Sequence, residues 1–164
     1  MVVTDLPTTT SKTENNLVAN IATIINPTGL VVGDSFSWSP KDNKVFADKS
    51  RLDQPHGQLA LIHEAGHALL GHQLYSSDID LLLKEVAAWN EAKKIANKLG
   101  VEYDEEHVED CLDTYRDWLH RRSQCPTCDI GSMQSSISSY ECINCHQKWR
   151  VSNSRFCRSY RLKK

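Results

Sequence analysis

The stretch LIHEAGHALLGH, residues 61–72, carries three histidines and one glutamate within an otherwise apolar run. His63, Glu64 and His67 form the pattern H-E-x-x-H. On a helix, residues four apart lie on the same face, so both imidazoles can reach one metal ion. Zinc suits two imidazole ligands, and the carboxylate of Glu64 can act as general base toward an attacking water. The pattern therefore predicts a hydrolytic zinc site on this helix.

A third ligand is needed for such a site, and the next predicted helix offers Glu85. On a helical wheel, Glu85 lies near the middle of the apolar face, close to Trp89. A carboxylate there is costly unless it is paired or bound to metal, so a buried salt bridge is the alternative role. Glu91 falls at the edge among lysines, which is typical of a solvated residue. Two histidines, one glutamate and an open fourth position are the pattern of zinc hydrolases.

The segments HEAGHALLGH and EVAAWNEAKKIA together resemble the ImmA/IrrE-type metallopeptidases, a gluzincin group with the HExxH motif. The resemblance covers roughly residues 35–100 and includes SFSWSPKDNKVFAD before the active-site helix. It implies an α+β fold with a small zincin-like minimal metallopeptidase domain. It also implies zinc bound by His63, His67 and Glu85, with Glu64 as the base. The spacing from His67 to Glu85 is compact, and no helix-turn-helix partner domain is evident.

Three further residues are candidates for stabilising the transition state: Tyr75, His72 and Tyr103. His72 lies five residues beyond His67, about 140° round the helical wheel, so it does not easily join the same metal. A histidine at the end of a helix can instead bind the last carbonyl groups.

Four cysteines form a second candidate metal site with the spacing C-x2-C-x13-C-x2-C. Two such knuckles predict a closed, tetrahedral structural zinc site in a zinc ribbon of two small hairpins. The serine-rich DIGSMQSSISS between them cannot form a core, so we expect the metal to organise this module. His146 and Cys157 are less suited as ligands. The chain is thus predicted to bind two Zn²⁺ ions, one catalytic and one structural. The structural ligands are Cys125, Cys128, Cys142 and Cys145.

The segment HQKWRVSNSRFCRSYRLKK, residues 146–164, interleaves basic residues with Trp149, Phe156 and Tyr160. Such interleaving is compatible with nucleic-acid binding, through phosphate pairing and base stacking. Alternatively, the aromatic residues pack the ribbon and the charges keep it soluble. In a third interpretation, the basic ribbon docks on acidic helices, especially EYDEEHVED, and covers or shapes the active-site cleft.

Charge and hydropathy place these motifs in a protein with an acidic body and a basic end. From Arg121 onward there are nine Lys/Arg and two Asp/Glu, although the whole chain has a net charge of −2. No apolar run reaches the roughly 18 residues of a membrane span. The start, MVVTDLPTTTSKTENN, lacks the apolar core of a signal peptide. We therefore expect a cytoplasmic protein with no membrane partner.

The elements that must position these residues follow from apolar periodicity and from turn residues. LVV, SFSW and KVFAD are strand-like, and SPKDNK indicates a hairpin joining the last two. Either SFSW or KVFAD could offer an edge along which a peptide substrate lies extended. Helices are predicted at about 14–26, 58–72, 78–99 and 105–122. The predicted domains are a disordered N-terminus (1–13), the HExxH metallopeptidase domain (14–122) and the basic four-cysteine zinc ribbon (123–164).

The sequence thus predicts a zinc-dependent endopeptidase that hydrolyses an intracellular protein or peptide. Its ribbon would bind the substrate, bind nucleic acid, or dock on the chain's own catalytic domain. The alternative is a non-enzymatic zinc-ribbon protein, a nucleic-acid-binding or protein adaptor in which the HExxH domain is a metal-stabilised scaffold. The intact Glu64 favours the enzyme, because a scaffold needs no base.

Overall fold

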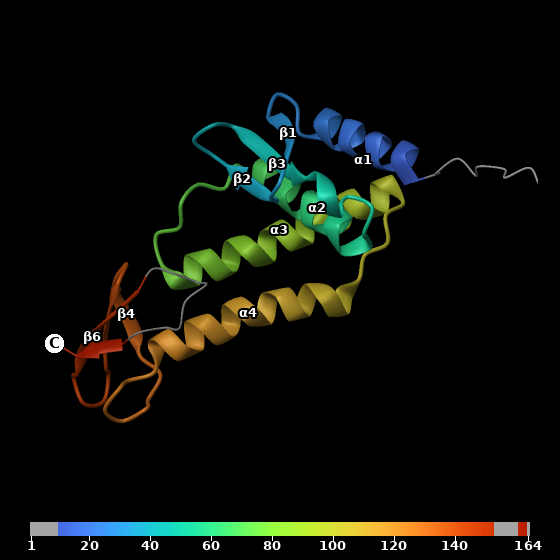
Figure 1. Ribbon diagram of the computed structural model, residues 1–164. Helices are drawn as coiled ribbons and strands as arrows, with labels where there is room; N and C mark the ends of the chain where they lie inside the picture. Colours follow the sequence, from blue (N-terminus) through green and yellow to red (C-terminus); the bar gives the residue numbers. More distant parts are fainter. Residues whose placement is uncertain (1–9, 153–160, 164) are drawn as a thin grey trace, which may run out of the picture. The chain divides into compact units, whose positions relative to one another are not determined.

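The computed structural model describes residues 10–152 and 161–163, which form an α+β protein (Figure 1). Residues 1–9 of the predicted disordered segment, and Phe156, Cys157 and Tyr160, lie outside this range. The helices are α1 (Thr10–Ile24), α2 (Pro55–Leu69), α3 (Asp78–Leu99) and α4 (Glu105–Ser123), with a short 3-10 turn η1 (Lys49–Arg51). The strands are β1 (Gly29–Gly33), β2 (Ser37–Ser39), β3 (Lys44–Asp48), β4 (Met133–Ser136), β5 (Ser139–Glu141), β6 (Lys148–Val151) and β7 (Arg161–Lys163).

The chain divides into two compact units. The first comprises Met1–Gln73 with Ala87–Asp104, and the second comprises Leu74–Val86 with Glu105–Lys164. Helix α3 belongs to both units, and α4 shares its unit with the four-cysteine module, which we define as residues 124–152. The domain boundary predicted near Ser123 stays a prediction.

The first unit contains a three-stranded sheet in the order β1-β3-β2. β1 runs parallel to β3, and β2 pairs antiparallel with β3 across a turn in which Asn43 has a φ of 52°. The predicted hairpin is therefore confirmed. KVFAD forms the central strand, so its prediction as a substrate-binding edge is wrong, because both of its sides already pair with neighbours. β2, which overlaps SFSW at Ser37 and Trp38, is an edge strand of this sheet.

Helix α2 packs an apolar face into the core of the first unit. Pro55 begins the helix, where its missing N–H costs no hydrogen bond. The helix ends at Leu69, three residues before the predicted end, because Gly71 takes a φ of +62° and turns the chain. The buried apolar residues of α2 and β3 are Leu59, Leu61, Ile62, Ala65, Val45 and Ala47.

The other helices follow their predictions closely. α3 has the predicted bounds and is followed by Gly100 with a φ of +67°. α4 is one residue longer than predicted, and α1 begins four residues earlier and ends two earlier. No helix in the described part of the chain is long and apolar enough to span a membrane.

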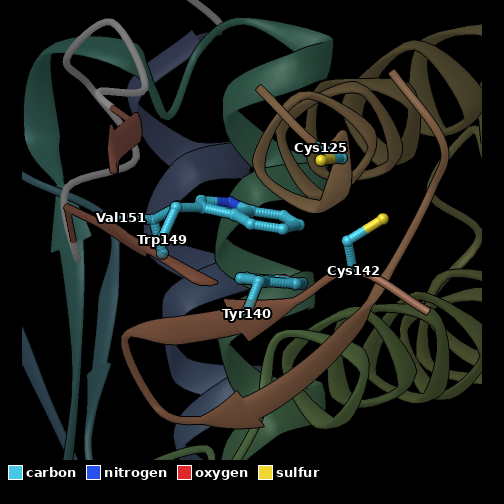
Figure 2. Packing of buried hydrophobic residues seen from close by; sticks show 5 residues of the cluster. All are labelled: Cys125, Tyr140, Cys142, Trp149 and Val151. Carbon is cyan, nitrogen blue, oxygen red and sulfur yellow. The ribbon is translucent and has the colours of Figure 1, made fainter. Parts of the chain in front are cut away.

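The four-cysteine module has its own small core, drawn in Figure 2. Its strands β4, β5 and β6 belong to an antiparallel sheet in the order β4-β5-β6-β7, in which β7 lies beyond the module. The ring of Tyr140 stacks on that of Trp149, with centroids 5.6 Å apart and an angle of 13° between the planes. Two cysteines and Val151 complete this cluster, so metal ligands and aromatic rings share one core.

Candidate metal centres

The thiols of the four-cysteine module converge on one point. Within the set Cys125, Cys128, Cys142 and Cys145, the ligand atoms all lie within 4.8 Å of one another. Three Sγ···Sγ distances are 3.5–3.6 Å, far longer than a disulfide bond. A tetrahedral zinc ion with Zn–S bonds of about 2.3 Å would separate its sulfurs by about 3.8 Å. The four cysteines therefore fit a metal ion of this size.

The two C-x-x-C segments adopt the same turn. Asp129 and His146, each the residue after the second cysteine of a pair, both have a φ of 57°. Their N–H groups donate to the carbonyl oxygens of Cys125 at 2.9 Å and of Cys142 at 3.1 Å. His146 is exposed within its turn and does not belong to the converging set.

The thiols differ in their tendency to ionise. N–H groups of Cys145 and Asn144 donate to the Sγ of Cys142 and lower its pKa to about 6. The N–H of Gln147 lowers the pKa of Cys145, but burial and the neighbouring thiols raise it by more. The result is a pKa of about 12. Four thiols this close cannot all ionise without a cation, and a bound metal ion supplies the missing positive charge.

The second site centres on helix α2. The Nε2 atoms of His63 and His67 lie 3.1 Å apart. Zn–N bonds of about 2.0–2.1 Å in tetrahedral geometry give a separation of about 3.4 Å, so the two imidazoles fit one ion. The ring of His63 is 7 % exposed and stacks on Trp89 of α3, with centroids 4.1 Å apart. This stacking fixes the plane of the first ligand.

Glu85 is the third member of the set predicted from the helical wheel. It lies one turn before Trp89 on α3, and its side chain is 6 % exposed. Ligand atoms of His63, His67 and Glu85 all lie within 4.8 Å of one another, so these residues can hold a metal ion. The rival Glu91 instead accepts a 2.6 Å hydrogen bond from Lys94, as expected for a residue at the edge of the apolar face.

Glu64 occupies the position between the two histidines on α2 and is half-buried. It is not a member of the converging ligand set among the described residues. A carboxylate one residue after a metal ligand, and outside the ligand set, suits a proton acceptor.

His72 lies beside the second ligand. Its Nδ1 is 2.8 Å from Nδ1 of His67, on the side of that ring opposite Nε2. The indole Nε1–H of Trp38 donates to the backbone carbonyl of His72 at 2.8 Å, which anchors the segment to β2. Sequence reasoning missed this contact, because it extended α2 to residue 72, whereas the turn at Gly71 brings His72 back toward the helix.

Replacing His72 by alanine should weaken metal binding at the histidine site by about 10–100-fold, a typical effect of losing a group that orients a ligand. Titration of the zinc-free chain with Co²⁺, followed by absorbance, measures the affinity. His120→Gln, an exposed histidine on α4, is the control and should leave it unchanged. Equal affinity for His72→Ala and wild type would contradict an orienting role.

The close approach of α2 and α3 depends on Gly66. A Cβ at this position would lie 2.6 Å from the carbonyl oxygen of Ala88. Gly66→Ala should therefore destabilise the protein by about 1–3 kcal/mol, because two helix backbones must separate. Gly33→Ala is the matched control, since its Cβ meets nothing within 4 Å. Urea denaturation measures both, and equal midpoints would contradict the prediction.

The other two candidate stabilisers differ in their surroundings. The hydroxyl of Tyr103 donates to the carbonyl oxygen of Trp89 at 3.1 Å, so its proton is already engaged. Lys93 Nζ lies 5.6 Å from the centroid of its ring. Tyr75 is half-buried in the segment between α2 and α3. A role for either in stabilising a transition state stays a prediction.

The sequence makes Trp149 a candidate for stacking on nucleic-acid bases. Its side chain is 0 % exposed, and its Nε1–H donates to the carbonyl oxygen of Arg122 at 3.0 Å. The prediction that the aromatic residues pack the ribbon is therefore confirmed for Trp149.

Sequence reasoning also missed Arg122. It is 1 % exposed, and its Nε donates to Asp78 at 2.8 Å. The signal was available: Arg122 follows Trp118 by four residues and so lies on the apolar face of α4.

No family model, no curated protein and no solved structure matches this chain significantly. Function is therefore inferred from the residues and their geometry.

Proposed function

We propose that the chain is a zinc-dependent metallopeptidase of the gluzincin type, with a minimal zincin-like catalytic domain and a structural zinc in the four-cysteine module. The observation that carries the proposal is the convergence of the ligand atoms of His63, His67 and Glu85. Glu64 directly follows the first of these ligands in the chain. Three ligands leave a fourth position open, which is typical of catalytic zinc. The resemblance of these segments to ImmA/IrrE-type metallopeptidases agrees with this assignment.

In the proposed mechanism of peptide hydrolysis, the metal ligands hold the zinc and Glu64 transfers the proton. Bound zinc would act as a Lewis acid on the scissile carbonyl and favour ionisation of water. A carboxylate oxygen of Glu64 takes one proton as water adds to the carbonyl carbon. The same carboxyl group then gives that proton to the leaving amine as the C–N bond breaks. The products are a carboxylic acid and an amine, and Glu64 returns to its initial state.

The substrate is proposed to be an extended peptide that pairs with the outer edge of β2. This strand is at the edge of its sheet, and Trp38 within it is tied to the segment that carries His72. Backbone pairing with an edge strand binds peptides of varied sequence, since it uses main-chain groups. The adaptor alternative has weaker support, because burial of Trp149 removes one of its three candidate stacking rings.

The proposal is tested by incubating the full chain with unfolded host proteins and identifying new N-termini by mass spectrometry. The zinc-loaded chain should produce cleavages that disappear after chelation and return with zinc. A chain with two bound zinc ions that cleaves nothing would overturn the proposal, and salt-sensitive binding of nucleic acid by that chain would favour the adaptor.

A further inference from the structure

A buried polar network lies where α3 begins. Asp78, the first residue of α3, is 1 % exposed, as is Arg122 at the end of α4. Arg122 donates to the Asp78 carboxylate from Nε at 2.8 Å and from Nη2 at 3.4 Å. The hydroxyl of Tyr140 on β5 donates to the same carboxylate. A single carboxylate thus joins two helices and a strand within the second unit.

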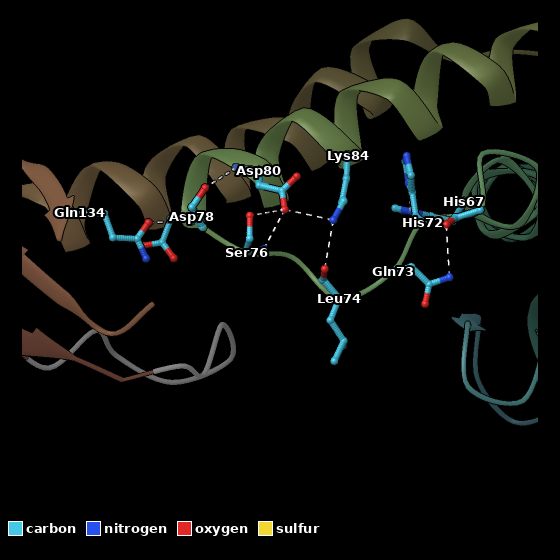
Figure 3. Close-up of polar contacts among 11 residues, drawn as sticks. His67, His72, Gln73, Leu74, Ser76, Asp78, Asp80, Lys84 and Gln134 are labelled. Carbon is cyan, nitrogen blue, oxygen red and sulfur yellow. Dashed lines mark hydrogen bonds and ion pairs between the residues drawn. The ribbon is translucent and has the colours of Figure 1, made fainter. Parts of the chain in front are cut away.

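The backbone at the start of α3 is held as well. The N–H of Asp78 donates to the side-chain Oε1 of Gln134 on β4 at 2.8 Å (Figure 3). Asp80 accepts hydrogen bonds from the N–H of Ser76 at 2.7 Å and from Lys84 Nζ at 3.0 Å (Figure 3). The N–H of Ser76, followed by the interaction with Lys84, lowers the pKa of Asp80. The first turns of α3 are therefore fixed to the four-cysteine module and to their own preceding segment.

The same network reaches the cysteine ligands through the module's core. Tyr140 stands two residues before Cys142 and shares a buried cluster with Cys142 and Cys125. Arg122 stands three residues before Cys125, and its carbonyl accepts the hydrogen bond from Trp149 in that cluster. Loss of the metal would leave this cluster without the ion that joins its two cysteine pairs, so the anchor of Asp78 depends on that ion.

Asp78 and Glu85 belong to the same helix and the same unit. Seven residues separate them, which is about two helical turns, so they lie on one face of α3. The anchor at Asp78 therefore sets both the rotation of the helix about its axis and the position of Glu85 along it. A small rotation of the helix moves a side-chain oxygen by more than the tolerance of a metal–ligand bond.

We propose that Asp78 is a positioning residue, through which the four-cysteine module and its metal hold Glu85 in place as the third ligand of the histidine site. Occupancy of the cysteine site thereby strengthens metal binding at the histidine site. This inference rests on the two metal sites of the proposed function, but not on any peptidase activity.

The test measures Co²⁺ affinity of the histidine site in the full chain with zinc retained at the cysteines. Tyr140→Phe removes only the hydroxyl that binds Asp78 and keeps the ring that packs on Trp149. It should weaken Co²⁺ binding about tenfold. This is the lower end of the range of affinity losses that follow when a group that orients a metal ligand is removed. Arg122→Gln should do the same, whereas Arg116→Gln, which breaks only exposed ion pairs on the same helix, should not. If Tyr140 and Arg122 served only to stabilise the fold, these variants would have a lower melting temperature but an unchanged affinity for Co²⁺.

A second measurement uses the wild-type chain, so it does not depend on how a variant folds. Hydrogen exchange of the amides of residues 79–85 is followed with the histidine site empty, before and after removal of the cysteine-bound metal. Exchange should speed up when that metal is removed. Unchanged affinity in a folded Tyr140→Phe, or unchanged exchange in the wild type, would overturn the inference. The proposed peptidase activity would stand in either case, since it is read from cleavage by the fully loaded chain.

Discussion

Replacing Glu64 by glutamine should lower kcat for peptide hydrolysis by roughly 10²- to 10⁴-fold, the usual contribution of a positioned acid–base group. Glutamine has nearly the same shape as glutamate, but it cannot accept the proton of the attacking water. Metal content should remain at two ions per chain, because Glu64 is outside both converging ligand sets. Rates are measured on a peptide taken from a cleavage site found with the wild type, and metal is measured by elemental analysis.

Glu91→Gln makes the same chemical change on α3, at a carboxylate that binds Lys94 rather than the histidine site. Its kcat should equal that of the wild type. Full activity of Glu64→Gln would contradict the assigned base, while Glu85→Ala with two ions still bound would contradict the assigned third ligand. The inactive Glu64→Gln chain should also retain substrate, which makes it a trap for the natural substrate.

Replacing Cys142 by serine should remove one metal ion and unfold the four-cysteine module. Binding of structural zinc stabilises comparable small modules by about 10–16 kcal/mol at neutral pH, so the remaining core cannot compensate. Cys142 is fully buried within the cluster that holds Tyr140 and Trp149. NMR signals of residues 124–152 should collapse toward random-coil positions, and proteases should cut there first.

Cys111→Ser provides the control for this change. Cys111 is half-buried on α4, outside the converging cysteines, and lies 3.7 Å from Nε2 of His107. Its burial, with added repulsion from Asp110 and Glu85, raises the pKa of this thiol, so it remains neutral near pH 7. This variant should keep both metal ions and the fold of residues 124–152. A stable, folded module in Cys142→Ser would show that the metal does not organise it.

The ligand sets followed from sequence because each depends on local rules. Spacing by four residues on a helix brings His63 and His67 to one face, and a helical wheel is enough to find Glu85 inside an apolar stripe. Each C-x-x-C segment forms a turn whose backbone shape depends on local sequence. The same left-handed conformation recurs at Asp129 and His146, the residues that follow the two pairs. The end of α3 is marked by Gly100, which has a φ of +67° and is also a local signal.

Other features depended on contacts between distant segments. The strand order, with KVFAD in the centre, comes from pairing of β1 with β3, and periodicity in either strand does not specify its partner. The contact between His72 and His67 depends on where α2 ends, and helix ends are the least certain feature of a sequence pattern. The partner of Arg122 lies 44 positions away, on another helix.

The sequence by itself determined which residues can bind metal, because their types and spacing along helices and turns are sufficient for that chemistry. The role of Glu64 in proton transfer is part of the proposed function. Only the tertiary structure decided what holds those residues in place: the turn that orients His67, the close approach at Gly66, and the buried Asp78 that fixes α3. The physical reason is that a ligand's identity is local, whereas its position is set by burial and pairing of groups that the chain brings together from far apart.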